Sequence, residues 1–172
     1  MKGLSLIIAI IIYSHFSDAQ ALNAKQDVDD KTFISQAIVG GFKEINASEM
    51  AMHVAITPDV KDFAKKMIAD HGKANRELKS IIKSKGYHIK VPSVDDVTRD
   101  PLLGGTTGTA FENNYILLMI KDHKKMLTLF KNAAGQIQDP EIRAFAKRTL
   151  PILQQHCASI KALAEKIRLN IR

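Results

Sequence analysis

The sequence has few of the residues that interrupt or cross-link a fold. Its 172 residues include one cysteine, no tryptophan, five prolines and nine glycines. The single Cys157 excludes an intramolecular disulfide, and we interpret it as a small buried hydrophobic side chain rather than a ligand. Four of the glycines and two of the prolines fall within residues 86–109, so the rest of the chain is free to form long helices.

Long apolar runs are also missing, except at the N-terminus. There Lys2 precedes an almost continuous apolar run that ends at Tyr13, and small residues follow before Gln20. This run is shorter than the roughly 20 residues that span a bilayer, so the pattern predicts a secretory signal peptide at residues 1–19. The alternative is an uncleaved anchor. We therefore expect an exported protein, in the periplasm or associated with the outer membrane, with a flexible segment at residues 20–28.

Acidic residues are fewer than basic ones, 18 against 25, which gives a formal net charge of +7. The lysines are spread over several segments and are not gathered with aromatic residues. Because the protein is also expected to be exported, nucleic acid is not an expected partner. A solvated basic surface is the simplest interpretation, and weak attraction to anionic polymers of the cell envelope is the alternative.

Apolar residues recur at spacings of three and four in four segments after residue 27. No strand pattern of comparable quality is present. Pro58 and Pro140 suit the first turn of a helix, and Gly86 suits a C-terminal stop. The predicted helices cover about residues 29–56, 58–85, 110–137 and 140–167. Two short turns and one long connection then predict an all-α domain at residues 29–170, an up-down four-helix bundle with a long crossover (86–109) between helices 2 and 3.

Two short segments, "MIADHGK" at 67–73 and "MIKDHKK" at 119–125, nearly repeat one another. An α-helix turns by about 100° per residue, so the direction of each side chain follows from its position. On this basis His71 and His123 lie at the centre of the apolar face of their helices, and His156 does so in the fourth helix. Three helices are therefore expected to direct one histidine each toward the core.

The first helix has Glu44 on its core side, among small residues, whereas its His53 is expected to face solvent. Glu44 and His71 lie at similar distances from the turn at Thr57, and the histidines of the third and fourth helices lie at similar distances from the turn near residue 138. One carboxylate and three imidazoles are thus predicted to meet at mid-height. A buried carboxylate is costly unless it is paired.

Imidazole and carboxylate groups in the core of a bundle suit a transition-metal ion such as zinc, iron, manganese or copper, and we expect zinc or iron. Alternatively, each histidine is a core group bonded to a backbone carbonyl or a serine. Four methionines are interpreted as core filling rather than as a copper-binding stripe: Met52, Met67, Met119 and Met126. The predicted metal ligands are Glu44, His71, His123 and His156.

Two aspartates, Asp70 and Asp122, precede two of these histidines and lie at the edge of the apolar face, where helices touch. Each is predicted to accept a ring N–H from a histidine of an adjacent helix, or to act as an additional ligand. The alternative for both is an ordinary surface pair with lysine.

Four segments carry a family resemblance: "AIVGGFKEINASEMA", "VKDFAKKMIADHGKANREL", "YILLMIKDHKKMLTLF" and "IRAFAKRTLPILQQH". Together, over about residues 30–165, they resemble a bacterial family of exported proteins catalogued as domain of unknown function 4142, often labelled predicted outer membrane protein. The resemblance implies a ferritin-like bundle in the cell envelope but no known reaction. The chain lacks the Glu-x-x-His pairs of di-iron bundles. The polar positions of the family fall on Glu44, Asp70, His71, Asp122, His123 and His156.

Two functions are compatible with the sequence. The first is an exported metal-binding bundle whose ion is structural or sequestered. The second is a metal-free envelope stress or interaction module, with a hydrogen-bonded cluster of core histidines and a partner bound by the crossover or the basic faces. The sequence offers no nucleophile, phosphate loop or substrate pocket, so an enzyme is not the favoured interpretation.

Overall fold

The computed structural model describes residues 29–167 and 169, so the predicted signal peptide and N-terminal segment lie outside the described residues. In this part of the chain the structure consists of helices joined by loops, without strands. The long helices are α1 (Asp30–Val54), α2 (Pro58–Ser84), α3 (Gly108–Gln136) and α4 (Pro140–Lys166). A short 3₁₀ turn, η2 (Pro101–Leu103), lies within the crossover. The all-α four-helix prediction is confirmed, with helix boundaries displaced by about two residues.

Local sequence signals account for where the helices begin. At the start of α1, the Asp29 side chain accepts hydrogen bonds from two backbone N–H groups of the first turn. Asp139 does the same for α4. Pro58 and Pro140 occupy the first helical position of α2 and α4, where a missing backbone N–H has no cost.

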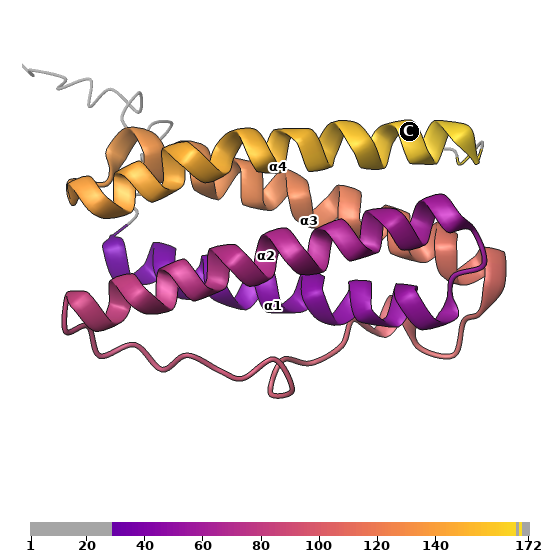
Figure 1. Cartoon of the computed structure of the whole chain (residues 1–172), viewed down its shortest axis with the longest axis horizontal. Coiled ribbons are helices and arrows are strands. Elements are labelled where there is room, and N and C mark those ends of the chain that lie inside the picture. The colour runs from indigo at the N-terminus through magenta and orange to yellow at the C-terminus, as the bar shows by residue number, and fades with distance from the viewer. Residues whose placement is uncertain (1–28, 168, 170–172) are drawn as a thin grey trace, which may run out of the picture.

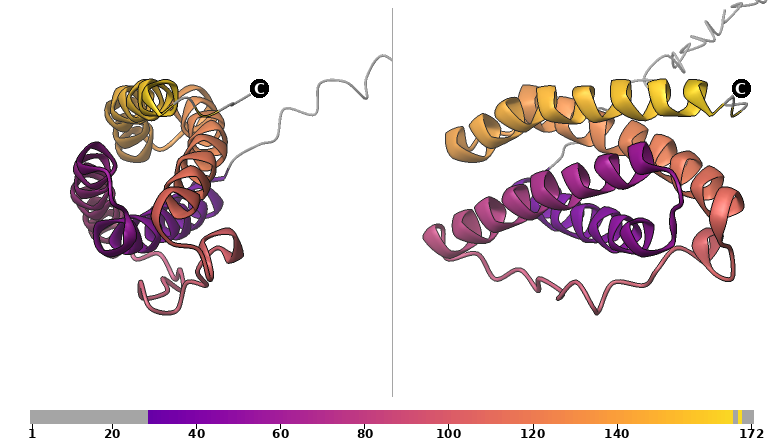
Figure 2. Two further views of the ribbon diagram at one scale, coloured as in Figure 1. Left: turned by 90° about the vertical axis from the view of Figure 1, so that its right-hand side faces the viewer. Right: turned by 45° about the vertical axis from the view of Figure 1, so that its right-hand side comes forward.

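The four helices form a bundle in which α1 and α2 are one hairpin and α3 and α4 are the other (Figure 1). Besides these pairs, α1 packs against α3 and α2 against α4. The end-on view in Figure 2 shows the helices arranged around a common axis. Because the crossover runs the length of the bundle, α2 and α3 point in the same direction, and each helix is antiparallel to both of its packing neighbours.

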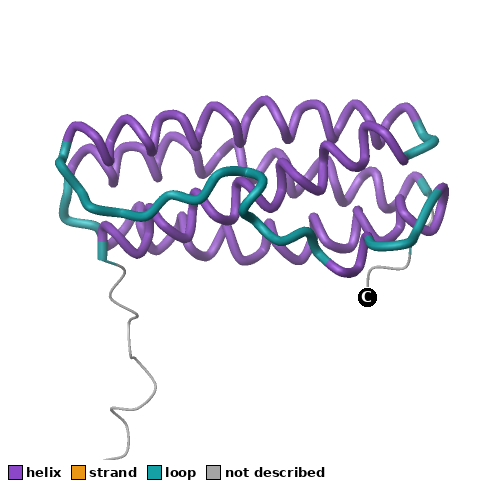
Figure 3. The backbone as a smooth tube through the Cα atoms, turned by 90° about the horizontal axis from the view of Figure 1, so that it is seen from below, coloured by secondary structure: helices purple, strands orange, loops and turns teal. Residues whose placement is uncertain are grey.

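The crossover lies along the outside of the bundle, as seen from below in Figure 3. Asn46 of α1 fastens it, because its amide nitrogen donates to the carbonyl oxygens of Val94 (2.8 Å) and Val97 (3.2 Å). Two residues of the crossover itself, Val97 and Leu103, are buried in the hydrophobic clusters of the bundle. The long connection is therefore a packed part of the domain, held against α1 and α3.

The core consists of two hydrophobic clusters separated by a polar layer. Along α3, Met119 belongs to one cluster and Met126 to the other, with His123 between them. His71 and His156 have the same intermediate position in α2 and α4. The apolar clusters hold the helices together on both sides of this layer. Three of the methionines predicted to fill the core are buried, namely Met67, Met119 and Met126, while Met52 is half-buried.

None of the described helices is both long enough and apolar enough to cross a membrane.

Candidate metal centre

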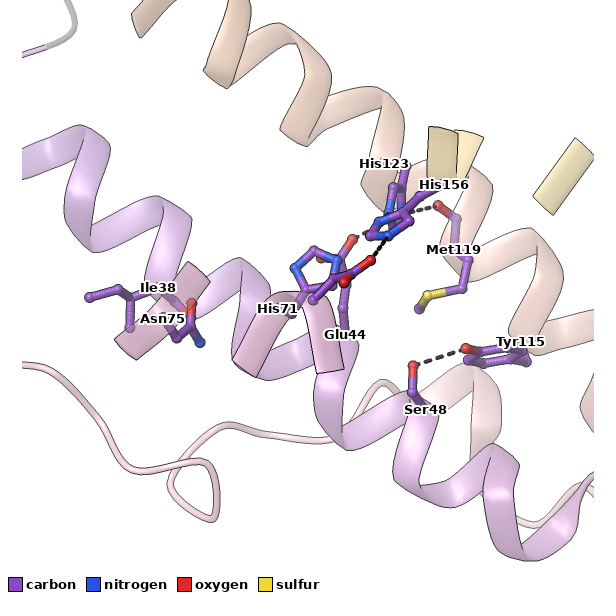
Figure 4. A network of polar contacts seen from close by, with 10 residues as sticks. Ile38, Glu44, Ser48, His71, Asn75, Tyr115, Met119, His123 and His156 are labelled. Carbon is purple, nitrogen blue, oxygen red and sulfur yellow. Dashed lines mark hydrogen bonds and ion pairs between the residues drawn. The ribbon is translucent and has the colours of Figure 1, made fainter. Parts of the chain in front are cut away.

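Glu44, His71, His123 and His156 come from the four different helices and meet in the polar layer at the middle of the bundle (Figure 4). All four are buried, with exposed fractions between 0% and 5%. The fourth histidine of the described helices, His53, is exposed, in agreement with the angular prediction. The helical periodicity therefore located four side chains that converge in three dimensions.

The carboxylate of Glu44 faces two imidazoles. Its Oε2 lies 3.2 Å from Nε2 of His71, and its Oε1 lies 3.1 Å from Nδ1 of His123. Neither approach has the angular geometry of a hydrogen bond, so both Glu44 oxygens and Nε2 of His71 are buried without a hydrogen-bond partner. Three buried polar atoms in one cluster thus lack a hydrogen-bond partner, which is costly for the metal-free core.

On the other side of the polar layer, hydrogen bonds define which ring nitrogen of His123 and of His156 carries a hydrogen. The carbonyl oxygen of Met119 can only accept, so Nδ1 of His123, 3.1 Å away, carries a hydrogen. Nε2 of His156 donates to Oδ2 of Asp70 at 2.8 Å, which leaves a lone pair on Nδ1 of His156. That lone pair lies 3.3 Å from Nε2 of His123. The contact is favourable only if a cation lies there: either a second proton on His123 or a metal ion.

When no metal is bound, the negative charge of Glu44 favours the protonated state of His123. Burial is the largest influence on the pKa of His123 and lowers it, but the negative charge of Glu44, together with the polar contacts to Glu44 and to the Met119 carbonyl, raises that pKa overall. Burial alone would raise the pKa of Glu44, but the positive charge of its histidine neighbours holds it below the usual range. Of these neighbours we assign the charge to His123, because burial lowers the pKa of His71.

His71 and His156 are neutral at pH 7. Burial lowers the pKa of both, and that of His156 falls to about 4 despite its hydrogen bond to Asp70. A neutral imidazole is the form that binds a metal ion. Two of the three histidines are therefore in the ligand form, and His123 carries the proton that a metal ion would displace.

The donor set fits a metal ion. One ligand atom from each of the three histidines can be chosen so that all lie within 4.8 Å of one another. The unsatisfied oxygens of Glu44 provide a negative charge beside them. Imidazole and carboxylate together suit the divalent first-row metals from manganese to zinc. The cluster could thus hold a transition-metal ion.

The two aspartates of the repeated motif have different surroundings. Asp70 accepts from His156 on the adjacent helix α4, and it also binds Nζ of Lys66 at 2.9 Å. Asp122 makes no hydrogen bond to any histidine of the described residues, and its ion pair with Lys125 is long, at 3.7 Å. Burial and then the charge of Glu44 raise the pKa of Asp122, with a smaller contribution from Asp100. Asp122 therefore faces α1 and the crossover and pairs with none of the described histidines.

Other buried polar groups escaped the sequence analysis. Ser48 and Tyr115 share a hydrogen bond of 2.9 Å beside the histidines (Figure 4). Asn75 donates to the carbonyl oxygen of Ile38 at 3.2 Å. Glu112 is 2% exposed and accepts hydrogen bonds at the junction of α1 and α2. A polar residue flanked by apolar ones at helical spacing is the signal that could have identified them.

Solved structures with the same fold support the architecture. CopM in the Cu(I)-bound form superposes with a TM-score of 0.69 and 20% identity, covering 80% of this chain and 96% of that one. CopM in the Cu(II)-bound form superposes with a TM-score of 0.68 and 18% identity, covering 80% of this chain and 97% of that one. CopM in the Ag-bound form, obtained by co-crystallization, superposes with a TM-score of 0.67 and 20% identity, covering 80% of this chain and 96% of that one. At this identity the likeness establishes the fold.

No match is found among curated proteins. The profile of the family described as Domain of unknown function (DUF4142) matches residues 15–163. This range includes all four helices up to Leu163 and the whole polar layer. The chain is therefore a member of the DUF4142 family.

Proposed function

We propose that this protein binds a copper ion in the core of its bundle, with Glu44, His71, His123 and His156 as ligands and Asp70 as the residue that orients His156. The observation that carries the proposal is the convergence of buried, unsatisfied groups: both oxygens of Glu44 and Nε2 of His71 have no hydrogen-bond partner. A metal ion would satisfy these lone pairs together with those of the other two rings.

Copper is a better choice than the zinc or iron expected from the sequence. CopM, which shares the fold, has been solved with Cu(I), Cu(II) and Ag bound, and nothing comparable supports zinc or iron. Imidazole and carboxylate ligands also suit Cu(II), which binds a given nitrogen and oxygen site more tightly than the other divalent first-row metals do. The ion would contribute a compact positive charge to a site that already carries the negative charge of Glu44.

The ion is better described as a sequestered cargo than as a structural element. Apolar clusters pack the helices above and below the polar layer, so the bundle has a core that does not depend on a metal. A protonated His123 would replace the charge of the ion in the metal-free state. Both features favour a protein that remains folded while it gains and loses metal.

The site would function outside the cytoplasm. Lys2 and the apolar run to Tyr13 support export, with cleavage after Ala19. N-terminal sequencing of the protein recovered from the periplasmic fraction tests this part of the proposal, with Gln20 as the expected first residue. Recovery only in the cytoplasm, with Met1 retained, would contradict export.

The metal proposal is tested by loading the mature chain, purified without a histidine tag, with Cu(II) and removing excess ion by gel filtration. We expect elemental analysis to find about one copper ion per chain, because the four proposed ligands of one chain form a single site. His71→Ala should lose the copper, whereas His53→Ala, which removes an exposed histidine from α1, should keep it. Circular dichroism verifies that both variants remain helical.

The alternative of a metal-free interaction module predicts a different result. In that case the wild-type protein would emerge without copper, and a chelator would leave its melting temperature unchanged. Copper retained equally by wild type and His71→Ala would also contradict the proposal, because it would place the ion elsewhere.

A further inference from the structure

A groove reaches the metal centre from outside. A cavity of about 520 Å³ lies between α1 and α3, and Glu44 forms part of its lining. A second cavity of about 450 Å³ lies beneath the crossover. The two share four lining residues: Val39, Lys43, Asp100 and Asp122. One continuous depression therefore leads from the crossover to a residue of the buried cluster.

Glu44 connects this depression with the histidines. Only 1% of its surface is exposed, and neither carboxylate oxygen has a hydrogen-bond partner. The same carboxylate lies within 3.2 Å of His71 and His123. A group that arrives through the groove thus meets an unsatisfied carboxylate that already faces the inner site.

The deepest charged residues of the groove are acidic. Four basic residues of the lining are exposed at its rim: Lys43, Arg99, Lys121 and Lys125. The acidic residue Asp96 is also exposed, but three other acidic residues lie deeper, since Asp100 and Asp122 are half-buried and Glu44 is buried. The ion pair of Asp122 with Lys125 is long and its lysine is exposed, so it is easily displaced. The inner part of the groove therefore suits a cation.

We propose that this groove is the entry path of the metal ion, and that Asp100 and Asp122 form an outer station from which a partly dehydrated divalent cation passes to Glu44. This inference rests on the proposed function, because it assumes that the inner cluster takes up an ion. It assigns to Asp122 a role in transfer, in place of the contact with histidine that the repeated motif suggested.

A residue of an entry path has a characteristic kinetic effect. It stabilises the ion on its way in and on its way out, so its removal slows association and dissociation by the same factor and leaves the equilibrium constant unchanged. Charges that line a narrow approach raise association rates by about 10- to 1000-fold, and salt weakens the effect. We expect Asp122→Asn to slow both rates about 10-fold at low ionic strength.

The experiment measures Cu(II) binding and release by stopped-flow absorbance for wild type, Asp122→Asn, Asp100→Asn and the double variant. Asp100 is distant in sequence from every predicted ligand, and asparagine can still accept the hydrogen bond that Asp100 receives from the backbone of Leu102. Asp62→Asn is the matched control, because it removes one exposed carboxylate from α2 at a cavity between α2 and α4. It should bind and release copper at the wild-type rates.

The outcomes separate the two proposals. Slower association in both groove variants, slowest in the double variant and with an unchanged dissociation constant, supports the entry path. Wild-type rates in the groove variants contradict the entry path while the metal centre stands. A weaker equilibrium constant at an unchanged association rate also contradicts it, because Asp122 would then be a ligand. A wild-type protein that binds no copper overturns the proposed function itself.

Discussion

At the scale of single residues, the core of this bundle depends on the charge of Glu44. A carboxylate in an apolar core is unfavourable unless a positive partner is close, and the nitrogen of His123 lies 3.1 Å away. The same interaction raises the pKa of His123 against the effect of its burial. Each of the two side chains therefore maintains the charged state of the other.

This dependence predicts the behaviour of Glu44→Gln. Without the negative charge, burial dominates, so the pKa of His123 should fall below its ordinary value of about 6.5. NMR titration of the histidine ring protons in the metal-free protein measures this shift. Glu49→Gln, which removes an exposed carboxylate of the same helix, is the control and should leave the titration of His123 unchanged. A variant of Glu44 in which His123 titrates as in the wild type would contradict the assignment of charge.

Asp70 acts through another side chain. Because it accepts the Nε2 hydrogen of His156, it directs the lone pair of Nδ1 toward His123 and makes that nitrogen more basic. Asp70→Asn keeps an acceptor oxygen but removes the charge, and it should weaken copper binding by roughly 10- to 100-fold. Competition with a chromophoric chelator measures the affinity. An affinity equal to that of Asp62→Asn would show that the charge of Asp70 has no such influence.

At the scale of secondary-structure elements, α1 and α2 approach closely at one point. A Cβ atom added to Gly41 would lie 2.6 Å from Oδ1 of Asn75, whose amide donates to the carbonyl oxygen of Ile38. Moving this buried asparagine away would break that hydrogen bond. Gly41 is therefore required by the packing of the helix pair rather than by the conformation of the backbone.

Accordingly, Gly41→Ala should lower the free energy of unfolding by about 1–3 kcal/mol, through crowding and the loss of a buried hydrogen bond. Urea unfolding of the metal-free protein measures the change. Gly135→Ala is the control, because no atom other than the adjacent backbone of its own helix lies within 4 Å of the added Cβ. The higher helix propensity of alanine should add up to about 1 kcal/mol. Equal stability of both variants would contradict the proposed packing role of Gly41.

The geometry of single helices also explains which site residues the sequence could predict and which it could not. Each helix has one buried face, so an angular projection identified the inward direction of Glu44 and of the three histidines. Asp70 and Asp122 occupy the same place in the repeated motif, yet only Asp70 meets a histidine. A projection gives the direction of a side chain from its own helix but does not identify the neighbouring helix.

Contacts made by loops were beyond sequence analysis for a related reason. Glu112 of α3 accepts the backbone N–H groups of Ile56 (2.8 Å) and Thr57 (2.5 Å) and the hydroxyl of Thr57 (2.8 Å). These donors belong to the turn between α1 and α2, and only the path of the crossover brings α3 beside them. The direction of α2 relative to α3 depends on the same path, which the spacing of residues 86–109 did not reveal.

At the scale of the whole molecule, the buried histidines connect folding with pH. In the unfolded chain each histidine titrates near pH 6.5. In the folded protein the pKa of His156 is about 4 and that of His71 is lowered as well, so the unfolded state binds more protons below pH 6.5. His123, whose folded pKa is raised, is protonated in both states in that range, and its stabilising contribution is lost only as the pH rises above 6.5.

The stability of the metal-free protein should therefore fall as the pH is lowered from 6.5 toward 4. Each of the two histidines contributes a slope of at most about 1.4 kcal/mol per pH unit. Glu44 adds to this fall only in the lowest part of the window, because its folded pKa lies below the ordinary value of 4.5 and its own contribution starts to be lost as the pH drops below that value. Urea unfolding at a series of pH values in the presence of a chelator measures the slope.

A variant isolates the origin of this slope. His156→Gln removes one of the two titrating rings, so its stability should change less steeply with pH than that of the wild type between pH 6.5 and 4. His53→Gln should retain the wild-type slope, since His53 is exposed. A wild-type protein whose stability is constant across this window would mean that His71 and His156 are not neutral in the folded core. In that case, below pH 6.5, protons would have to be displaced from all three histidines before a metal ion could bind.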